Sequence, residues 1–278
     1  MHADNRHYEN FPVASWLCPA RLRAPIAAIY GFARTADDIA DEGDAPARQR
    51  LDDLASLRAD LMAARAGQAG SGRWPRVFGP LADMIAEFNL PVPLLADLLD
   101  AFEQDVVKTR EGSGYQTRAE LLDYCRRSAN PVGRLVLHLY GVNDEPARQM
   151  SDSICTALQL INFWQDLGLD IARCRYYLPL DECEAHGVSH LDLAGLRQNE
   201  NTTNLIATNV DRTRAMMLNG SQLVHKVPGR AGWELRLVVQ GGLRILDKIE
   251  AIGYATLTVR PTLKAWDVPV MLVRAMAM

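Results

Sequence analysis

Acidic side chains crowd into one short segment, FARTADDIADEGD, which continues from the apolar run APIAAIYGFA. Asp37 and Asp41 are four positions apart, so on a helix they share one face, and Arg34 lies on that face as well. Asp38 is one step around the helix. Like charges at this spacing repel one another by a few tenths of a kcal/mol. A helix that keeps them is either well solvated or has a cation to hold.

A second polar group lies in ALQLINFWQDLGLDIARCRYYLP. Gln159, Asn162, Asp166 and Asp170 follow one another at intervals of three and four, which makes a stripe along one helix face. The other side of this helix is rich in Leu, Ile, Phe and Trp. Such a polar stripe predicts a helix that is buried among others and turns the stripe toward a cavity.

Two such groups could together hold a metal ion. Oxygen ligands suit Mg²⁺, which is typically bound by one or two carboxylates together with substrate phosphates. Two facing helices that each offer carboxylates would therefore grip a diphosphate. The arginines available as direct phosphate partners are Arg21, Arg23, Arg34, Arg173 and Arg175. For either group alone an ordinary solvated acidic face is the better interpretation, but two groups in one chain favour a site.

The composition excludes several other classes of protein. The 278-residue chain has a net charge of −4 and no basic stripe, which argues against a nucleic-acid-binding protein. Its five cysteines show no CxxC spacing, so we expect reduced thiols and a cytoplasmic location. The polar N-terminus lacks the apolar core of a signal peptide. No apolar run reaches about 18 residues, so we expect no membrane-spanning helix.

The elements that must position these residues are helices nearly throughout, because apolar residues recur at three and four positions. We expect helices near 19–42, 45–66, 77–88, 91–107, 117–140, 144–170, 191–198, 203–224, 231–253 and 260–275. Pro131 should kink the helix that contains it. The stretch 176–189 looks irregular. No shift in composition divides the chain, which predicts a single all-α domain over residues 1–278.

The two acidic motifs, with LLDYCRRSANPVGRLVL between them, resemble the squalene/phytoene synthase family of isoprenoid synthases in content and order. The segments ENFPVAS and GWELRLVVQGGLRILDKIEAIGY extend the resemblance to nearly the whole chain. The resemblance implies a helical bundle around a central cavity. It also implies that Mg²⁺, and through it the substrate diphosphate, is bound by Asp37, Asp38, Asp41, Asp166 and Asp170.

The same resemblance implies further site residues. Those expected to bind the diphosphate or line its pocket are Tyr30, Arg34, Gln159, Asn162 and Tyr177, with Arg175 added as a phosphate partner. Tyr124 matches a tyrosine of the family thought to act near the leaving group.

The departures from the family pattern point to one branch. Members that condense two prenyl diphosphates usually have an Arg-Asp pair in the second motif and an acid before its last aspartate; here Gln165 and Leu169 stand at those places. The motifs SANPVGRLVLHLYG and NFWQD most resemble the bacterial hydroxysqualene synthases. That implies ionisation of presqualene diphosphate and quenching of the rearranged carbocation by water. Asn130, Asn162 and Gln165 are candidates to hold this water, because they are polar within apolar helices.

Two alternatives remain open at this stage. One is an enzyme that condenses two prenyl diphosphates to presqualene diphosphate, squalene or phytoene; the other is a non-catalytic bundle that acts as a partner protein. In the hydroxysqualene route, contact with presqualene diphosphate synthase and with the squalene-forming reductase is a further expectation. The basic, Trp-containing C-terminal segment RPTLKAWDVPVMLVRAMAM is typical of a helix that lies on a membrane surface, here the inner membrane, or of one that packs over the mouth of the cavity.

Overall fold

The computed structural model describes residues 18–278, which form helices and connecting segments without any strand. The prediction of an all-α fold is confirmed. The helices are α1 (Ala20–Asp41), α2 (Ala47–Arg65), α3 (Pro75–Phe88), α4 (Val92–Glu111), α5 (Arg118–Ser128), α6 (Asn130–Leu139), α7 (Glu145–Ala172), α8 (Leu180–Ala185), α9 (His190–Ala194), α10 (Glu200–Gly220), η1 (Ser221–His225), α11 (Arg230–Ala251) and α12 (Asp267–Met276). None of the helices between residues 18 and 278 is both long and apolar enough to cross a membrane.

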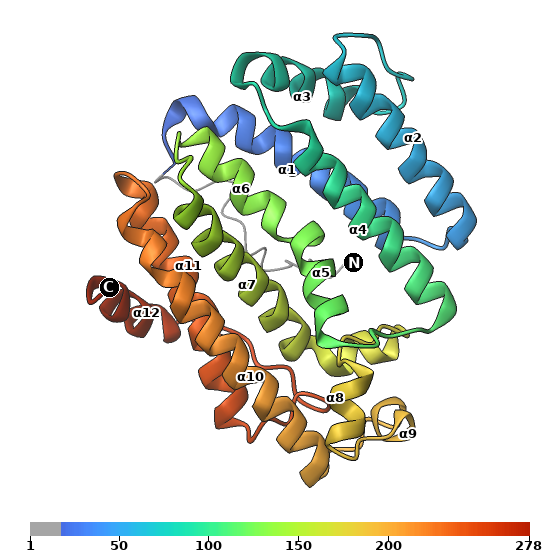
Figure 1. Ribbon diagram of the computed structural model, residues 1–278, viewed down its shortest axis with the longest axis vertical. Helices are drawn as coiled ribbons and strands as arrows, with labels where there is room; N and C mark the ends of the chain where they lie inside the picture. The colour runs from blue at the N-terminus through green and yellow to red at the C-terminus, as the bar shows by residue number, and fades with distance from the viewer. Residues whose placement is uncertain (1–17) are drawn as a thin grey trace.

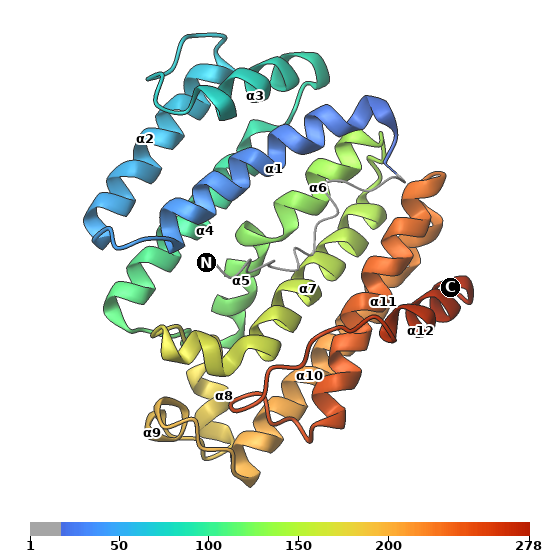
Figure 2. The same ribbon diagram turned by 180° about the vertical axis from the view of Figure 1, so that it is seen from behind.

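Helix α7 runs through the middle of the bundle, with α5 and α6 on one side and α10 and α11 on the other (Figures 1 and 2). Its start is fixed by Asp144, whose side chain accepts a hydrogen bond from the Ala147 amide at 3.0 Å. Leu160, Ile161 and Trp164 are at most 2% exposed, because helices pack against α7 from several directions. The second acidic motif therefore lies on the central helix of the fold.

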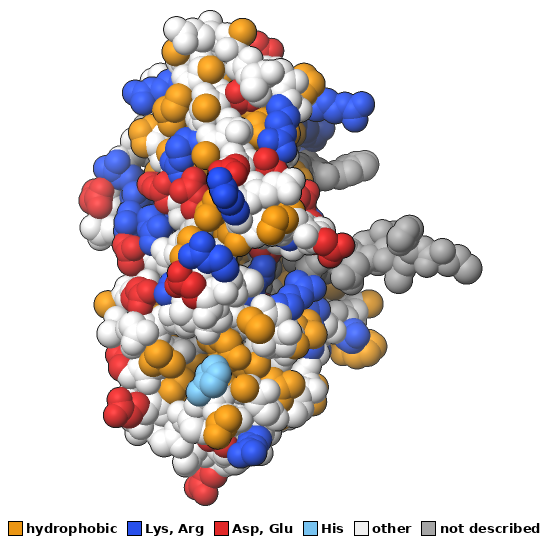
Figure 3. Space-filling model, turned by 90° about the vertical axis from the view of Figure 1, so that its right-hand side faces the viewer, with side chains coloured by type: hydrophobic (Ala, Val, Ile, Leu, Met, Phe, Trp, Pro, Cys, Tyr) orange, Lys and Arg blue, Asp and Glu red, His pale blue; other side chains and the backbone are white. Residues whose placement is uncertain are grey.

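Helices α1 to α4, together with Leu135 and Leu139 of α6, enclose a second hydrophobic cluster, distinct from the one around α7. Phe32 of α1 and Leu57 of α2 are fully buried in it. Burial of one face of α1 fixes the rotation of this helix, and with it the direction of the acids at its C-terminal end. On the side of the molecule seen in Figure 3, basic and acidic side chains are interspersed.

The expected helix over 117–140 is two helices. Helix α5 ends at Ser128, and Ala129, with φ −121° and ψ −47°, separates it from α6. The reason is Pro131 in the first turn of α6, which cannot donate the backbone hydrogen bond that a continuous helix needs. We expected a kink at this proline, and the structure has a full break.

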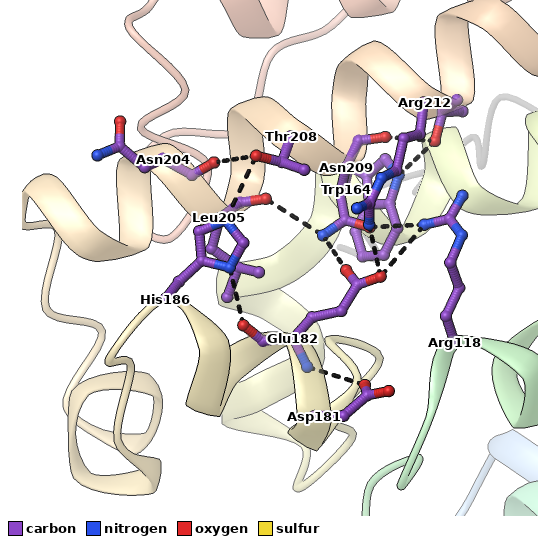
Figure 4. A network of polar contacts seen from close by, with 11 residues as sticks. Arg118, Trp164, Asp181, Glu182, His186, Asn204, Leu205, Thr208, Asn209 and Arg212 are labelled. Carbon is purple, nitrogen blue, oxygen red and sulfur yellow. Dashed lines mark hydrogen bonds and ion pairs between the residues drawn. The ribbon is translucent and has the colours of Figure 1, made fainter.

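The stretch 176–189, expected to be irregular, contains helix α8. A polar network around Glu182 fixes this helix against α10 (Figure 4). The Glu182 carboxylate accepts hydrogen bonds from Asn209 and Arg212, both at 2.7 Å, and Arg118 of α5 donates to the Asn209 side chain at 3.0 Å. These partners are remote in sequence, so tertiary contacts determine this helix.

The C-terminal helix expected over 260–275 begins only at Asp267. Residues 255–266, here called the strap, cross α7 in a largely irregular conformation. The Gln165 side chain of α7 donates to the carbonyl oxygen of Pro261 at 2.7 Å. Because a proline offers no amide for a helix and its carbonyl is held by α7, the strap cannot wind into the helix that its apolar spacing suggests.

Gly168 allows the strap to lie directly on α7. Its amide donates to the Thr256 carbonyl at 3.3 Å, and a Cβ atom at this position would collide with the carbonyl oxygen of Leu257. We predict that Gly168→Ala lifts the strap and destabilises the protein by about 1–3 kcal/mol, the usual cost of overpacking. Thermal unfolding checks this. Gly241→Ala is the control, because its Cβ would meet Met271 at 3.5 Å, an ordinary contact; equal melting temperatures of both variants would contradict the prediction.

Asp267 seats helix α12 on α11. Its carboxylate is fully buried and accepts from Arg244 at 2.8 Å and from the Lys264 amide at 2.7 Å, with Lys248 at 2.9 Å. Helix α12 thereby turns one face toward α11, while Trp266 just before it is 69% exposed. The outward side of α12 is apolar, with Val268, Leu272, Val273 and Met276 all substantially exposed.

Candidate functional site

A cavity of about 980 Å³ lies between α1, α4, α5, α7, α11 and the strap, and α12 lines part of it. Asp37 and Asp41 of α1 and Asp166 and Asp170 of α7 line this cavity. Helices α1 and α7, which lie far apart in the sequence, bring both acidic motifs to this one cavity. Asp38 faces Arg34, with 2.8 Å between carboxylate and guanidinium.

Arginine side chains form ion pairs with the aspartates of this cavity. Arg175 donates to both carboxylate oxygens of Asp41, at 2.9 and 2.5 Å, and so joins the C-terminal ends of α1 and α7. Arg34 lies 3.1 Å from Asp37 on the same helix. The predicted phosphate partners Arg34, Arg173 and Arg175 line the cavity, whereas Arg21 and Arg23 are not among its lining residues.

The sequence did not single out Arg260 for this site. Arg260 lies on the strap and donates to both carboxylate oxygens of Asp166, at 2.5 and 3.0 Å. In the sequence, Gln165 stands before Asp166 where members of the family that condense two prenyl diphosphates usually have an arginine. A guanidinium does reach Asp166, but it comes from 94 positions further along the chain. The basic, apolar pattern of the C-terminal segment gave no sign of this contact, because it depends on how the strap folds back.

Burial and mutual repulsion make two of the aspartates hard to ionise. Burial, reinforced by Asp41, raises the pKa of Asp37 to about 6. Burial, reinforced by Asp166, raises the pKa of Asp170 to about 7. A cation that enters the cavity would relieve both effects.

The donor set fits Mg²⁺ in its chemistry, since it consists of carboxylate oxygens on two sides of one cavity. Within residues 18–278, no three His, Cys, Asp or Glu side chains are grouped closely enough to hold an ion by themselves. Asp37, Asp41 and Asp166 form ion pairs with Arg34, Arg175 and Arg260 respectively. The arrangement suits an ion that arrives with its own phosphate oxygens.

An apolar pocket of about 260 Å³ adjoins the acidic cavity. The residues that line both are Ser128, Gln159, Asn162, Glu234 and Val238. Beyond them the pocket walls are largely apolar, with Val132 and Val136 of α6 and Leu158 of α7 among them. A ligand with a charged head and a hydrocarbon tail would therefore find matching surroundings at both ends.

One wall of the acidic cavity is aromatic. Tyr124, Phe163 and Tyr177 line it, and the rings of Phe163 and Tyr177 stack with centroids 3.6 Å apart. The Tyr124 ring lies 6.1 Å from that of Phe163. The structure thus brings Tyr124 and Tyr177 to the cavity, as the family resemblance implied.

Asp105 of α4 is a cavity residue that sequence reasoning missed. Tyr124 donates its hydroxyl to the Asp105 carboxylate at 2.5 Å. Burial raises the pKa of Asp105 to about 7, although the hydrogen bond from Tyr124 opposes the shift. In the sequence this residue looks like one more acid on a mixed helix, since its neighbours include Glu103 and Lys108. Only the packing of α4 against α5 shows its place.

The remaining predicted residues lie in three kinds of surroundings. Gln159 and Asn162 line the junction of the two cavities. Gln165 lines the acidic cavity, and its amide group binds the strap. Asn130 is buried, accepts a hydrogen bond from Thr156 at 2.9 Å and, like Tyr30, is not among the residues that line either cavity. The motif ENFPVAS lies outside the described residues.

Comparison with known proteins supports the same interpretation. A sequence model of the squalene/phytoene synthase family matches residues 4–267. A hydroxysqualene synthase of Sinorhizobium fredii is 34% identical over 249 residues, which cover 89% of this chain and 80% of that protein. A hydroxysqualene synthase of Zymomonas mobilis is 37% identical over 216 residues, or 77% of this chain and 69% of the relative.

Solved structures share the fold. The crystal structure of squalene synthase HpnC from Alicyclobacillus acidocaldarius superposes with a TM-score of 0.80 at 37% identity, covering 89% of this chain and 90% of that one. A dehydrosqualene synthase in complex with a ligand superposes with a TM-score of 0.77 at 18% identity, over 94% of this chain and 88% of the other. The second likeness supports the fold alone.

Proposed function

The chain belongs to the squalene/phytoene synthase family, and from this premise we propose that it is a hydroxysqualene synthase. In this reaction presqualene diphosphate loses its diphosphate, the carbocation rearranges, and water adds to give hydroxysqualene. The observation that carries the proposal is the junction of an acidic, arginine-rich cavity with an apolar pocket, in a chain 34% identical to a hydroxysqualene synthase over most of its length.

The acidic end is suited to the leaving group. Asp37, Asp38 and Asp41 of α1, with Asp166 and Asp170 of α7, would hold Mg²⁺, which supplies Lewis-acid stabilisation to the departing diphosphate. Arg34, Arg175 and Arg260 would exchange their carboxylate partners for phosphate oxygens, to which guanidinium groups bind in pairs of hydrogen bonds. Gln159 lies at the inner edge of this region, and Tyr30 stays a prediction from the resemblance.

The aromatic and apolar walls are suited to the carbocation. Phe163, Tyr124 and Tyr177 present π-systems that attract a cation and offer little that would react with it. Asn162 lies where the acidic cavity meets the apolar pocket, which is a suitable place to hold one water molecule. Asn130 and Gln165 stay candidates for the same task; Asn130 accepts a hydrogen bond from Thr156, and Gln165 donates one to the Pro261 carbonyl oxygen.

The second candidate function is condensation of two prenyl diphosphates, and it is favoured by one observation: the similar solved structure from Alicyclobacillus acidocaldarius is described as a squalene synthase. A product assay separates the two. Purified protein with Mg²⁺ receives presqualene diphosphate or farnesyl diphosphate, without NADPH. We expect hydroxysqualene from the first substrate and no condensation product from the second. Presqualene diphosphate formed from farnesyl diphosphate would overturn the proposed function in favour of the second.

In this function the protein would act after an enzyme that supplies presqualene diphosphate and before a reductase that consumes the alcohol. Direct contact with these two enzymes stays a prediction from the family resemblance, as does a cytoplasmic location.

Peripheral contact with the inner membrane has support from the C-terminal region. Val268 and Leu272 line the cavity but are also about half exposed, next to the exposed Trp266. A lipid product could leave along this side.

We predict that exposed apolar groups of this region contribute to vesicle binding. Trp266→Ala combined with Val273→Asp should reduce co-sedimentation with vesicles of phosphatidylglycerol and phosphatidylethanolamine, because an interfacial helix binds through its buried apolar area. Trp233→Ala is the control, since Trp233 is also exposed but lies on α11 under Arg236. Equal binding of all three proteins would remove the membrane interpretation.

A further inference from the structure

Addition of water to a carbocation leaves a proton that must be accepted within the cavity. The carboxylates of the two acidic motifs are poor candidates, because Asp41 and Asp166 bind guanidinium groups through both oxygens. In the proposed function these groups would also hold the metal. A separate acceptor would have to line the cavity and lie beside the wall that receives the cation.

Asp105 meets these conditions. It lines the cavity from α4, outside both acidic motifs, and accepts a hydrogen bond from the neutral phenol of Tyr124. The Tyr124 ring belongs to the aromatic wall, 6.1 Å from Phe163 and 6.5 Å from Tyr177 between centroids. The bond from Tyr124 uses Oδ2 of Asp105. The carboxylate is thus fixed next to the surface on which a cation would rest.

We propose that Asp105 is the general base that accepts the proton of the quenching water, held in position by Tyr124. This inference rests on the proposed function. A lone pair of the water oxygen forms the new C–O bond to the carbocation, one water O–H bond breaks, and its proton goes to Asp105, which becomes a neutral carboxylic acid. No oxidant or reductant is needed, and the proton returns to solvent when the product leaves.

The surroundings of Asp105 support this role. Burial raises the pKa of Asp105 above that of an ordinary carboxylate, which makes it a stronger proton acceptor. The charged groups that act on it are Asp37 and Asp41 of α1, which raise its pKa, and Arg175 after α7, which lowers it. Tyr124 on α5 lowers it as well.

The test compares Asp105→Asn, which keeps the shape but removes the base, with Asp100→Asn. Asp100 lies on the same helix and pairs with Arg58 at 2.6 Å, outside the cavity. With presqualene diphosphate and Mg²⁺, diphosphate release and hydroxysqualene are measured separately. We expect Asp105→Asn to release diphosphate with little change in KM while alcohol formation falls about 10²-fold, within the range of general-base catalysis. Hydrocarbons should replace the alcohol, and Asp100→Asn should behave as wild type.

Tyr124→Phe is the second variant. It removes the hydrogen bond that positions Asp105 but keeps the carboxylate itself, so it should lower the share of alcohol less than Asp105→Asn does. The wild-type share of alcohol should fall as the pH is lowered and Asp105 becomes protonated, and in Asp105→Asn it should not depend on pH. An unchanged share of alcohol in both variants would overturn the inference and indicate the released diphosphate as the acceptor. Weaker substrate binding with an unchanged share would overturn it too. A wild-type protein that makes no hydroxysqualene would instead refute the proposed function.

Discussion

Asp170→Asn is expected to make the metal-free protein more stable and to abolish nearly all turnover. In the native protein the Asp170 carboxylate is half-buried and lies near Asp166; desolvation, reinforced by Asp166, raises its pKa to about 7. An amide removes that cost. It also removes a metal-binding oxygen, and since Lewis-acid stabilisation is worth several kcal/mol, product formation should fall by about 10³-fold.

The pH dependence gives this prediction a sign that can be checked. Because the folded-state pKa of Asp170 lies above its ordinary value, its favourable contribution is present at low pH and is lost as the pH rises through about 7. The gain in melting temperature from Asp170→Asn should therefore be smaller at about pH 5 than at about pH 8. Asp152→Asn is the control on the same helix, where Asp152 pairs with Arg134 away from the cavity. A lower melting temperature for Asp170→Asn at high pH would contradict the account.

The all-α fold and the meeting of the acidic motifs could be predicted because both depend on local pattern. The stripe from Gln159 to Asp170 fixes one face of α7, and the apolar run before Asp37 fixes one face of α1. Two amphipathic helices with polar stripes have few ways to pack other than around a shared cavity. The spacing of these residues was therefore enough to predict the helices and the shared cavity, without knowledge of any long-range contact.

Asp105, Arg260 and helix α8 could not be predicted in this way, because tertiary contacts determine each. Asp105 acquires its role from Tyr124 on another helix, and Arg260 from a strap whose path depends on Gly168 and Gln165. Gln165 illustrates the limit well. Its polarity within an apolar helix suggested that it holds the quenching water, and the structure shows its side-chain amide bound to the strap.

Removal of Mg²⁺ is expected to stop product formation, and Mg²⁺ alone is expected to bind weakly. Arg34, Arg175 and Arg260 neutralise the acids in the metal-free protein, so an ion must compete with three guanidinium groups. Diphosphate would draw these groups away. Mg²⁺ with inorganic pyrophosphate should therefore raise the melting temperature by more than the sum of their separate effects, since each ligand improves the affinity for the other.

Arg260→Gln tests whether the Arg260 guanidinium competes with Mg²⁺ for the carboxylates of the second acidic motif. Without this guanidinium, Asp166 and Asp170 repel each other with less compensation, so Mg²⁺ alone should stabilise the variant more than it stabilises the wild type. The added effect of pyrophosphate should shrink, because one of its binding groups is gone. Arg274→Gln is the control, since Arg274 pairs with Asp247 at 2.6 Å and does not line the cavity. If Arg260→Gln responds to Mg²⁺ alone no better than wild type does, Arg260 does not compete with the metal, and the ion pair with Asp166 only anchors the strap.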